Sequence, residues 1–282
     1  MIERFLKQTT FTSVEDYNKN LEFIIPENFN FAYDVMDAWA QEKPDGLALL
    51  WTNDQGAEIK TTFHELKAQS DQAASYLQTL GIGKNDPVML ILKRRYEWWV
   101  IMLALCKIGA IVIPATHMLT KHDIVYRNTR ASVKAIICVD DPYVMSQVET
   151  AMPESPTVKV LVKVEDSSLT SLASHTSRAS EASEASNTSQ PSWHDWQSEW
   201  QKAPQFQRPA FVNTNDDTML MYFTSGTSGE PKMVAHDYLY AMGHLTTGVF
   251  WHNLHEGSLH LTVADTGWGK AVWGKFYGQW FA

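Results

Sequence analysis

The sequence predicts a layered α/β fold with a mostly parallel sheet, and three observations support this. Short apolar runs alternate with segments of helical periodicity from about residue 47 onward. The run Pro87 to Leu92 has no polar alternation, as expected for a strand buried on both faces. The 282 residues are 44% hydrophobic and 20% charged, a composition that can bury a sizeable core. Strands that alternate with helices need crossover connections, which favour parallel pairing.

The elements of the first half follow from turn and capping residues. Strands at 47–51 and 58–63 flank Asn53-Asp54-Gln55-Gly56, which has the residues of a hairpin turn. Thr62 and Glu65 form a capping box that begins a helix, and Gly81 ends it. The remaining segments alternate in type. We expect strands at 87–92, 110–115, 135–139 and 158–164, and helices at 96–109, 120–130 and 142–152.

Composition divides the chain into three parts. Serine recurs at every third position from 168 to 192, in a segment with almost nothing apolar to bury. We therefore expect a disordered or weakly ordered surface insertion, because nothing specific supports the alternative of a phosphorylated regulatory segment. The predicted parts are a first α/β subdomain (1–166), the serine-rich insertion (167–192) and the start of a second α/β subdomain (193–282).

The last part of the chain is rich in aromatic residues. Trp193, Trp196 and Trp200 have the spacing of a short amphipathic helix that docks on the body. Beyond them we expect strands at 218–223 and 258–264 and a helix at 238–247. The aromatic residues within 267–282 are typical of core material. We therefore expect the chain to be the front part of a longer protein.

Charge and cysteine content narrow the class of protein. A formal net charge of −9 argues against nucleic acid as a partner, which needs clustered positive charge. Two isolated cysteines, Cys106 and Cys138, fit a reducing cytoplasm. The apolar run from Trp98 to Ala115 approaches the length of a membrane span, but Lys107 and Gly109 divide it into a buried helix and a buried strand. Small-molecule substrates are thus the expected partners, whereas the oligomeric state is left open.

One loop carries the chemistry. Residues 224–232 read TSGTSGEPK and follow an apolar strand. Two glycines allow backbone N–H groups to surround an anion, four hydroxyls add donors, and Lys232 adds a cation, which together predict a polyphosphate site. The loop is not the nucleotide loop G-x-x-x-x-G-K-S/T, because Pro231 stands where that pattern needs glycine. It is not the hydrolase elbow G-x-S-x-G either, because Gly229 follows Ser228 directly.

This loop resembles the signature of the adenylate-forming (AMP-binding) superfamily. Further segments look like its medium-chain acyl-CoA synthetase or acetyl-CoA synthetase-like branch: Tyr96 to Trp99, Gly109 to Pro114, Leu119-Thr120, Asp123 to Arg127 and Asp265 to Lys270. The serine-rich insertion departs from that pattern. The fold implied is the αβα N-terminal domain of an adenylate-forming enzyme, truncated before its C-terminal part.

The resemblance also implies roles for individual residues. Lys232 would sit near the ATP phosphates, Trp268 would line an acyl pocket, and His236 would border it. The residues implied to wrap the phosphates are Thr224, Ser225, Gly226, Thr227, Ser228 and Gly229. His252 and His255 lie about one helical turn apart beside Glu256, but without a third ligand they do not predict a metal site.

The function implied is that of an ATP-dependent carboxylate–CoA ligase for a short- or medium-chain fatty acid or an aryl acid. ATP, Mg²⁺ and coenzyme A would be needed by the full-length enzyme. The family's metal-binding motif, its adenine and ribose contacts and the lysine of its mobile domain would all lie downstream of the loop. We therefore expect this chain to be inactive alone. One alternative is a non-catalytic nucleotide-binding or scaffold fragment, and aminoacyl adenylation ranks third.

Overall fold

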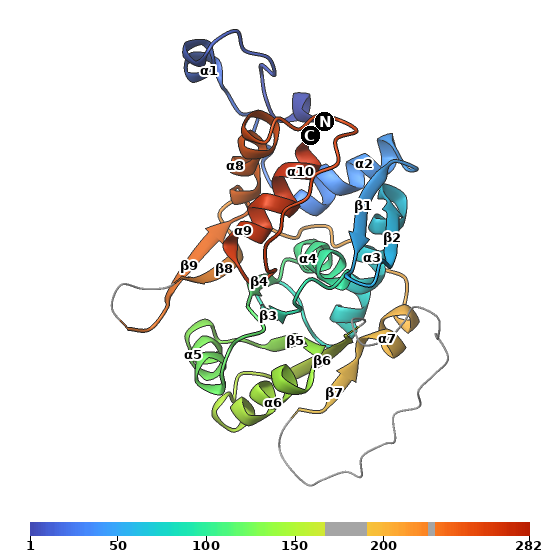
Figure 1. The fold of residues 1–282 in the computed structure, drawn as a ribbon, viewed down its shortest axis with the longest axis vertical. Coiled ribbons are helices and arrows are strands. Elements are labelled where there is room, and N and C mark those ends of the chain that lie inside the picture. Colours follow the sequence, from blue (N-terminus) through green and yellow to red (C-terminus); the bar gives the residue numbers. More distant parts are fainter. Residues whose placement is uncertain (167–190, 225–228) are drawn as a thin grey trace.

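A seven-stranded sheet crosses the middle of the molecule (Figure 1). The computed structural model describes residues 1–166, 191–224 and 229–282. In spatial order the strands are β7 (Trp193–Asp195), β6 (Val160–Glu165), β5 (Ala135–Asp140), β3 (Pro87–Ile91), β4 (Ile111–Pro114), β8 (Thr218–Thr224) and β9 (Lys232–Asp237). Neighbouring strands are parallel except for β8 and β9. The predicted layered α/β fold is therefore confirmed.

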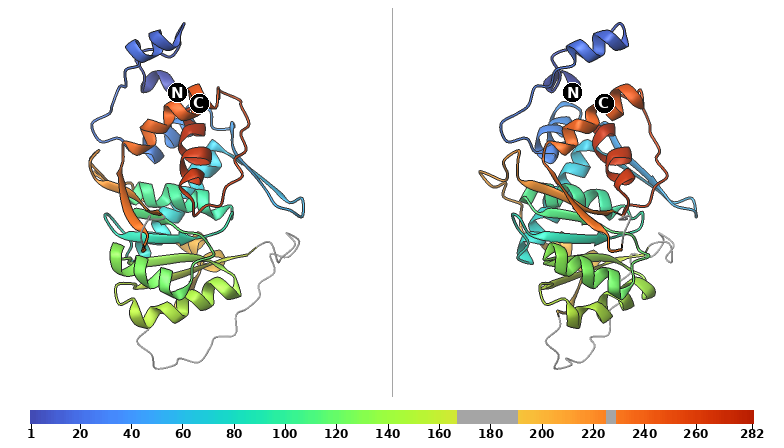
Figure 2. Two further views of the ribbon diagram at one scale, coloured as in Figure 1. Left: turned by 60° about the vertical axis from the view of Figure 1, so that its left-hand side comes forward. Right: turned by 90° about the vertical axis from the view of Figure 1, so that its left-hand side faces the viewer.

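Helices cover both faces of the sheet, as Figure 2 shows. One face packs against α5 (Lys121–Ala131) and α6 (Pro142–Ala151), and the other against α3 (Phe63–Thr79) and α4 (Glu97–Ile108). Successive side chains of β3 enter opposite cores: Val88 and Leu90 lie with α3 and α4, and Met89 lies with α5 and α6. Burial on both faces explains why this strand has no polar alternation.

A separate two-stranded hairpin precedes the sheet. It pairs β1 (Leu47–Thr52) with β2 (Glu58–Thr62) in antiparallel register. The predicted capping box is present at the start of α3, where the backbone N–H of Glu65 donates to Thr62 and the Glu65 carboxylate accepts from the Thr62 N–H. A second box joins Thr120 and Asp123 at the start of α5. Both helix starts predicted from sequence are confirmed.

The long apolar run divides as predicted. It forms α4, Gly109 in the left-handed conformation, and β4. In the described part of the chain, no helix combines the length and the hydropathy that a bilayer crossing requires. The two cysteines are buried and unpaired, and burial raises the pKa of Cys106 to about 12.

Two predicted elements differ from the structure. Trp193 lies in β7 and not in a helix, because the Asp195 side chain caps the Ser198 N–H and the helix α7 (Trp196–Glu199) starts only there. Residues 258–264 form no strand, although Leu259, Leu261 and Val263 alternate with more buried neighbours. A strand needs a hydrogen-bonded partner, and no described strand pairs with this segment.

Helices from both ends of the chain lie above the sheet as drawn in Figure 1. They are α2 (Ala38–Glu42), α8 (Tyr240–Thr246), α9 (Gly269–Val272) and α10 (Gly278–Phe281), whereas α1 (Val14–Asn20), which has no buried residue, projects from the body. Four aromatic side chains near the C-terminus are buried as predicted: Phe276, Tyr277, Trp280 and Phe281.

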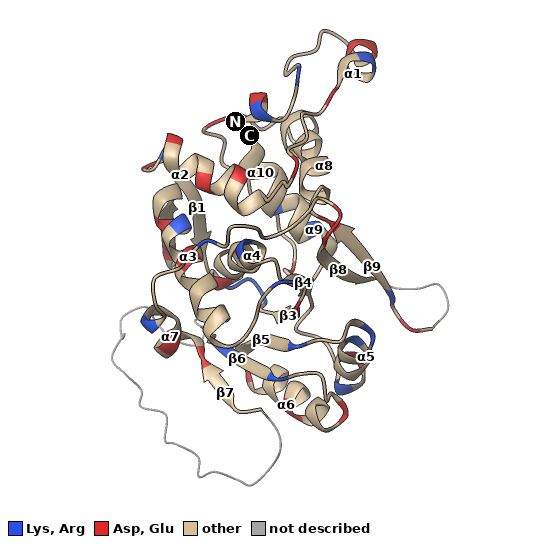
Figure 3. Cartoon of the chain, turned by 180° about the vertical axis from the view of Figure 1, so that it is seen from behind, with Lys and Arg blue, Asp and Glu red and all other residues tan. Residues whose placement is uncertain are grey.

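Strands from both predicted subdomains lie in the one sheet, and the boundaries of those subdomains stay a prediction. So does the behaviour of the serine-rich insertion, since residues 167–190 lie outside the described residues. Acidic and basic residues are interspersed along the described chain (Figure 3).

Candidate functional site

The predicted phosphate loop is the connection of an antiparallel hairpin at the edge of the sheet. Thr224 ends β8 directly opposite Lys232, the first residue of β9. Because β8 runs parallel to β4, the connection emerges where the carboxyl ends of the parallel strands lie. This edge is where open α/β sheets bind their ligands. Four predicted ligand residues, Ser225 to Ser228, fall outside the described part of the chain.

Helix α5 holds the base of this hairpin. The Tyr126 hydroxyl donates to the backbone oxygen of Pro231 at 2.9 Å, and its ring meets Phe223 edge-on at 6.1 Å between centroids. The guanidinium of Arg127 lies 5.2 Å from the centre of the Phe223 ring. Both ends of the connection are thus fixed to the body of the protein.

Gly229 and Lys232 fit the chemistry expected of them. Gly229 has φ +88°, a left-handed conformation that side-chain-bearing residues rarely adopt. Lys232 is exposed, and no carboxylate of the described residues lies within ion-pairing distance of it. Glu230, its neighbour in the turn, lies 3.4 Å from His122. The described part of the turn therefore offers a cation to an incoming anion.

His236 lies at the other end of β9 in an aromatic setting. Its ring centre is 4.1 Å from that of Tyr240 and 5.9 Å from that of Tyr222. Partial burial lowers the pKa of His236, so the imidazole is neutral at pH 7. Tyr240 also contacts His244, whose pKa burial lowers to about 4. Neutral imidazoles and tyrosine rings suit contact with an apolar ligand.

Trp268 belongs to a turn that packs closely against the backbone that follows β4. The backbone N–H of Trp268 donates to the Asp265 oxygen at 3.1 Å, and the Tyr222 hydroxyl donates to the Gly269 oxygen at 3.4 Å. A Cβ on Gly267 would lie 2.2 Å from backbone atoms that follow β4, so only glycine permits this approach. Trp268 itself is 57% exposed.

The structure thus connects residues that are distant in sequence. Tyr222 contacts both His236 and the Trp268 turn, which brings the two predicted acyl-pocket residues to one strand. Lys232 lies four residues from His236 along β9, or roughly 13 Å. Tyr126 and Tyr222 were not identified as site residues from the sequence. An apolar strand and a helix face give each tyrosine an ordinary packing role, and only the fold directs them to the site.

Neither the described histidines nor the described carboxylates assemble a metal centre. In the described ranges, no three His, Cys, Asp or Glu side chains come close enough to hold an ion. His252 stacks on His260 with ring centres 4.7 Å apart, and His255 lies elsewhere, along a cavity wall.

The chain is similar to known proteins over most of its length. A family model described as "AMP-binding enzyme" matches residues 36–276. The mouse protein "Acyl-coenzyme A synthetase ACSM5, mitochondrial" is 34% identical over 89% of this chain and 41% of its own length. Human ACSM4 of the same description is 34% identical over 91% of this chain, and ACSM3 of Pongo abelii is 30% identical over 96%. The chain spans about two fifths of the length of these relatives.

The expectation of a cytoplasmic location is wrong. The relatives named above are described as mitochondrial. The expectation rested on two unpaired cysteines, and cysteine usage reports the redox conditions that a protein meets, not the compartment that holds it.

Proposed function

This chain belongs to the AMP-binding enzyme family, and from that premise we propose that it is the N-terminal portion of an ATP-dependent carboxylate–CoA ligase. The observation that carries the proposal is the hairpin between β8 and β9. Its connection leaves the carboxyl edge of a parallel sheet and ends at Lys232, which has no carboxylate partner among the described residues. Acyl-coenzyme A synthetases among the relatives support the reaction class. A short- or medium-chain fatty acid or an aryl acid is the proposed substrate.

The proposed reaction has two steps. A carboxylate oxygen of the acid attacks the α-phosphorus of ATP, and pyrophosphate leaves with the electron pair of the broken P–O bond. The thiol sulfur of coenzyme A then attacks the carbonyl carbon, loses its proton, and displaces AMP to form the thioester. The first step develops charge on the leaving phosphates, which oriented N–H groups and a cation stabilise.

Each site residue has a proposed role. Backbone N–H groups and hydroxyls from Thr224 to Gly229 hold the polyphosphate, and Lys232 supplies positive charge beside it. His236 and Trp268 border the acyl group, with Tyr222 between them. A neutral His236 avoids placing an unpaired cation beside an apolar chain.

Among the described residues, no three His, Cys, Asp or Glu side chains come together to form an all-protein site for an ion. Mg²⁺ is usually held by one or two carboxylates together with the phosphates of the nucleotide, so such a cluster is not required of this part of the chain. We therefore assign no step and no residue here to the metal.

Nucleotide binding to Lys232→Ala tests the site. ATP binding to the wild-type chain should be weak, in the high-micromolar to millimolar range, because a few charge-assisted hydrogen bonds are offset by association entropy. ATP and GTP should bind about equally, AMP more weakly, and tripolyphosphate should compete. Lys232→Ala should weaken ATP binding several-fold, whereas Lys60→Ala, an exposed lysine on β2, should not.

NMR titration resolves the location of the nucleotide. The amide signals of Gly226 and Gly229 should shift when ATP is added. Unchanged positions of both signals at saturating ATP, in a folded sample, would refute the phosphate site. Catalysis is a separate measurement. ATP–pyrophosphate exchange with butyrate, octanoate or benzoate should stay at background for the 282-residue chain. Exchange in a longer form supports the ligase, whereas binding without exchange there supports the alternative of a non-catalytic nucleotide-binding or scaffold protein.

A further inference from the structure

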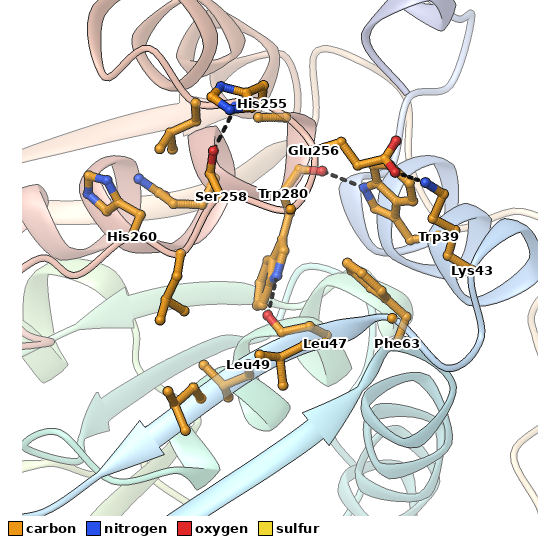
Figure 4. Close-up of a pocket in the computed structure, with 18 of the residues that line it drawn as sticks. Trp39, Lys43, Leu47, Leu49, Phe63, His255, Glu256, Ser258, His260 and Trp280 are labelled. Atoms are coloured by element: carbon orange, nitrogen blue, oxygen red, sulfur yellow. Dashed lines mark hydrogen bonds and ion pairs between the residues drawn. The ribbon is translucent and has the colours of Figure 1, made fainter.

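A cavity of about 310 Å³ lies between the β1 edge and residues 254–260 (Figure 4). None of the described residues of the phosphate and acyl sites lines it. Its volume is at the lower end of the range for small-molecule pockets. The cavity is therefore separate from the proposed catalytic site and has no assigned role.

The walls of this cavity are largely apolar and fixed in place. The main apolar side chains are Trp39, Leu47, Leu49, Phe63, Trp99 and Trp280. The indole N–H of Trp39 donates to the Trp280 oxygen at 2.7 Å, and that of Trp280 donates to the Ala48 oxygen at 2.9 Å. Both indoles have used their only donor, so their rings offer apolar surface to the cavity.

One charged side chain at the cavity, Lys275, has no opposite charge close by among the described residues. Lys43 and Glu256 neutralise each other as an ion pair at the wall. Lys275 is half-buried, and its ammonium group donates to the Ala264 oxygen at 2.6 Å and lies 5.5 Å from the centre of the Trp99 ring. Among the described residues, no carboxylate lies within ion-pairing distance of Lys275. A partly buried cation without a counter-charge is costly, and an anion in the cavity would remove that cost.

We propose that this cavity binds a small amphipathic anion, with its apolar chain between the aromatic side chains and its head group on Lys275. The Lys275 ammonium, which has no carboxylate partner among the described residues, and the apolar walls select this ligand class together. A neutral apolar molecule would leave the ammonium unpaired, and a small hydrophilic anion would leave the aromatic surface without a contact.

The probe for this site is octane-1-sulfonate, which carries the required charge and chain. A sulfonate is not a carboxylic acid, so its binding is independent of the ligase reaction. The indole N–H signals of Trp39 and Trp280 report directly on the cavity in a nitrogen–proton NMR titration. Both should shift on addition of the sulfonate. If neither moves at the highest soluble concentration of sulfonate, the proposal is overturned.

Variants separate the head-group contact from the apolar contact. Lys275→Met should weaken sulfonate binding about tenfold and leave octan-1-ol binding within twofold. Lys60→Met, a lysine that does not line the cavity, should leave both affinities unchanged. Equal sulfonate affinity for wild type and Lys275→Met overturns the proposal. An equal loss of octanol binding overturns it too, because Lys275 would then not act on the head group.

The pH dependence tests the wild-type chain without relying on the variant. Burial, with a contribution from Arg94, lowers the pKa of Lys275 to about 8, and Asp265 opposes this. The cation is therefore lost as pH rises through 8, and sulfonate affinity should fall about tenfold between pH 7 and 9.5. The other charged or titratable side chains that line the cavity are Lys43, His255, Glu256 and His260. Lys275→Arg should keep the affinity constant over this range, and a similar fall in that variant would overturn the assignment.

Discussion

Replacing Lys107 by methionine tests whether buried charges hold α4 to the helices beside it. The Lys107 side chain is 0% exposed, and its ammonium lies 2.9 Å from an oxygen of Asp37 and 2.5 Å from one of Asp71. Asp71 has a second partner in Lys67, also at 2.5 Å. Asp37, which is 7% exposed, has Lys107 as its closest cation among the described residues. The substitution therefore leaves the buried Asp37 carboxylate with no cation of the described residues within ion-pairing distance, and only the more distant Lys67 still acts on it.

The magnitude follows from that single unpaired carboxylate. Breaking a buried ion pair by removing one partner costs about 3–5 kcal/mol. For a domain of this size each kcal/mol corresponds to roughly 2–4 °C in Tm, so Lys107→Met should lower Tm by on the order of 10 °C. Burial already raises the pKa of Asp37, and loss of Lys107 raises it further. The difference from wild type should therefore narrow as pH falls and Asp37 takes up a proton.

Urea denaturation of a double-mutant cycle measures the effect. Lys107→Met should lose about 3 kcal/mol or more of unfolding free energy at pH 7. Adding Asp37→Asn, which removes the stranded charge, should restore at least half of that loss. A loss below about 1 kcal/mol, or a double variant no more stable than Lys107→Met, would refute the reasoning.

Two further predictions concern the candidate site. Gly267→Ala should lower the free energy of unfolding by about 2 kcal/mol or more, because the added Cβ would lie 2.2 Å from backbone atoms that follow β4. An unchanged melting curve, together with unchanged amide signals beside β4, would contradict this close approach. The pKa of His244 is lowered to about 4, so its neutral form favours folding and this contribution is lost as pH falls from about 6.5 to 4. After allowance for solvent screening, the free energy of unfolding should fall by about 1–2 kcal/mol over this pH range. The urea midpoint should therefore change less between pH 7 and pH 4.5 in His244→Gln than in wild type. An equal change in the two proteins would exclude His244 as the source.

Strands and helices were predictable where local pattern and burial agree. β3 and β4 are short apolar runs with turn residues beside them, and α3 and α5 have capping boxes. β9 was not predicted, because most of its residues are exposed and its strand character depends on pairing with β8. Residues 258–264 show the opposite case, an alternating pattern to which no described strand pairs.

The candidate site was predictable to the extent that its chemistry is local. Glycines, hydroxyls and Lys232 lie within nine residues, so their composition alone indicates an anion site. Tyr126 and Tyr222 reach the site through α5 and the sheet, and this depends on tertiary packing. The cavity beside Lys275 is built from β1 and residues more than 200 positions away, which no local pattern connects.

The pairing of β6 with β7 has a consequence for how this fold tolerates changes in chain length. The chain leaves β6 at Glu165 and returns at Trp193, which lies opposite Leu161. Along the strand direction, the start of β7 therefore lies only four residues, or roughly 13 Å, back from the end of β6. Each doubling of a flexible connection costs only about 0.6 kcal/mol in closure entropy. This outer edge of the sheet can thus accept a shortened connection or an inserted domain, while the hairpin at the opposite edge has both its ends fixed by α5 and β4.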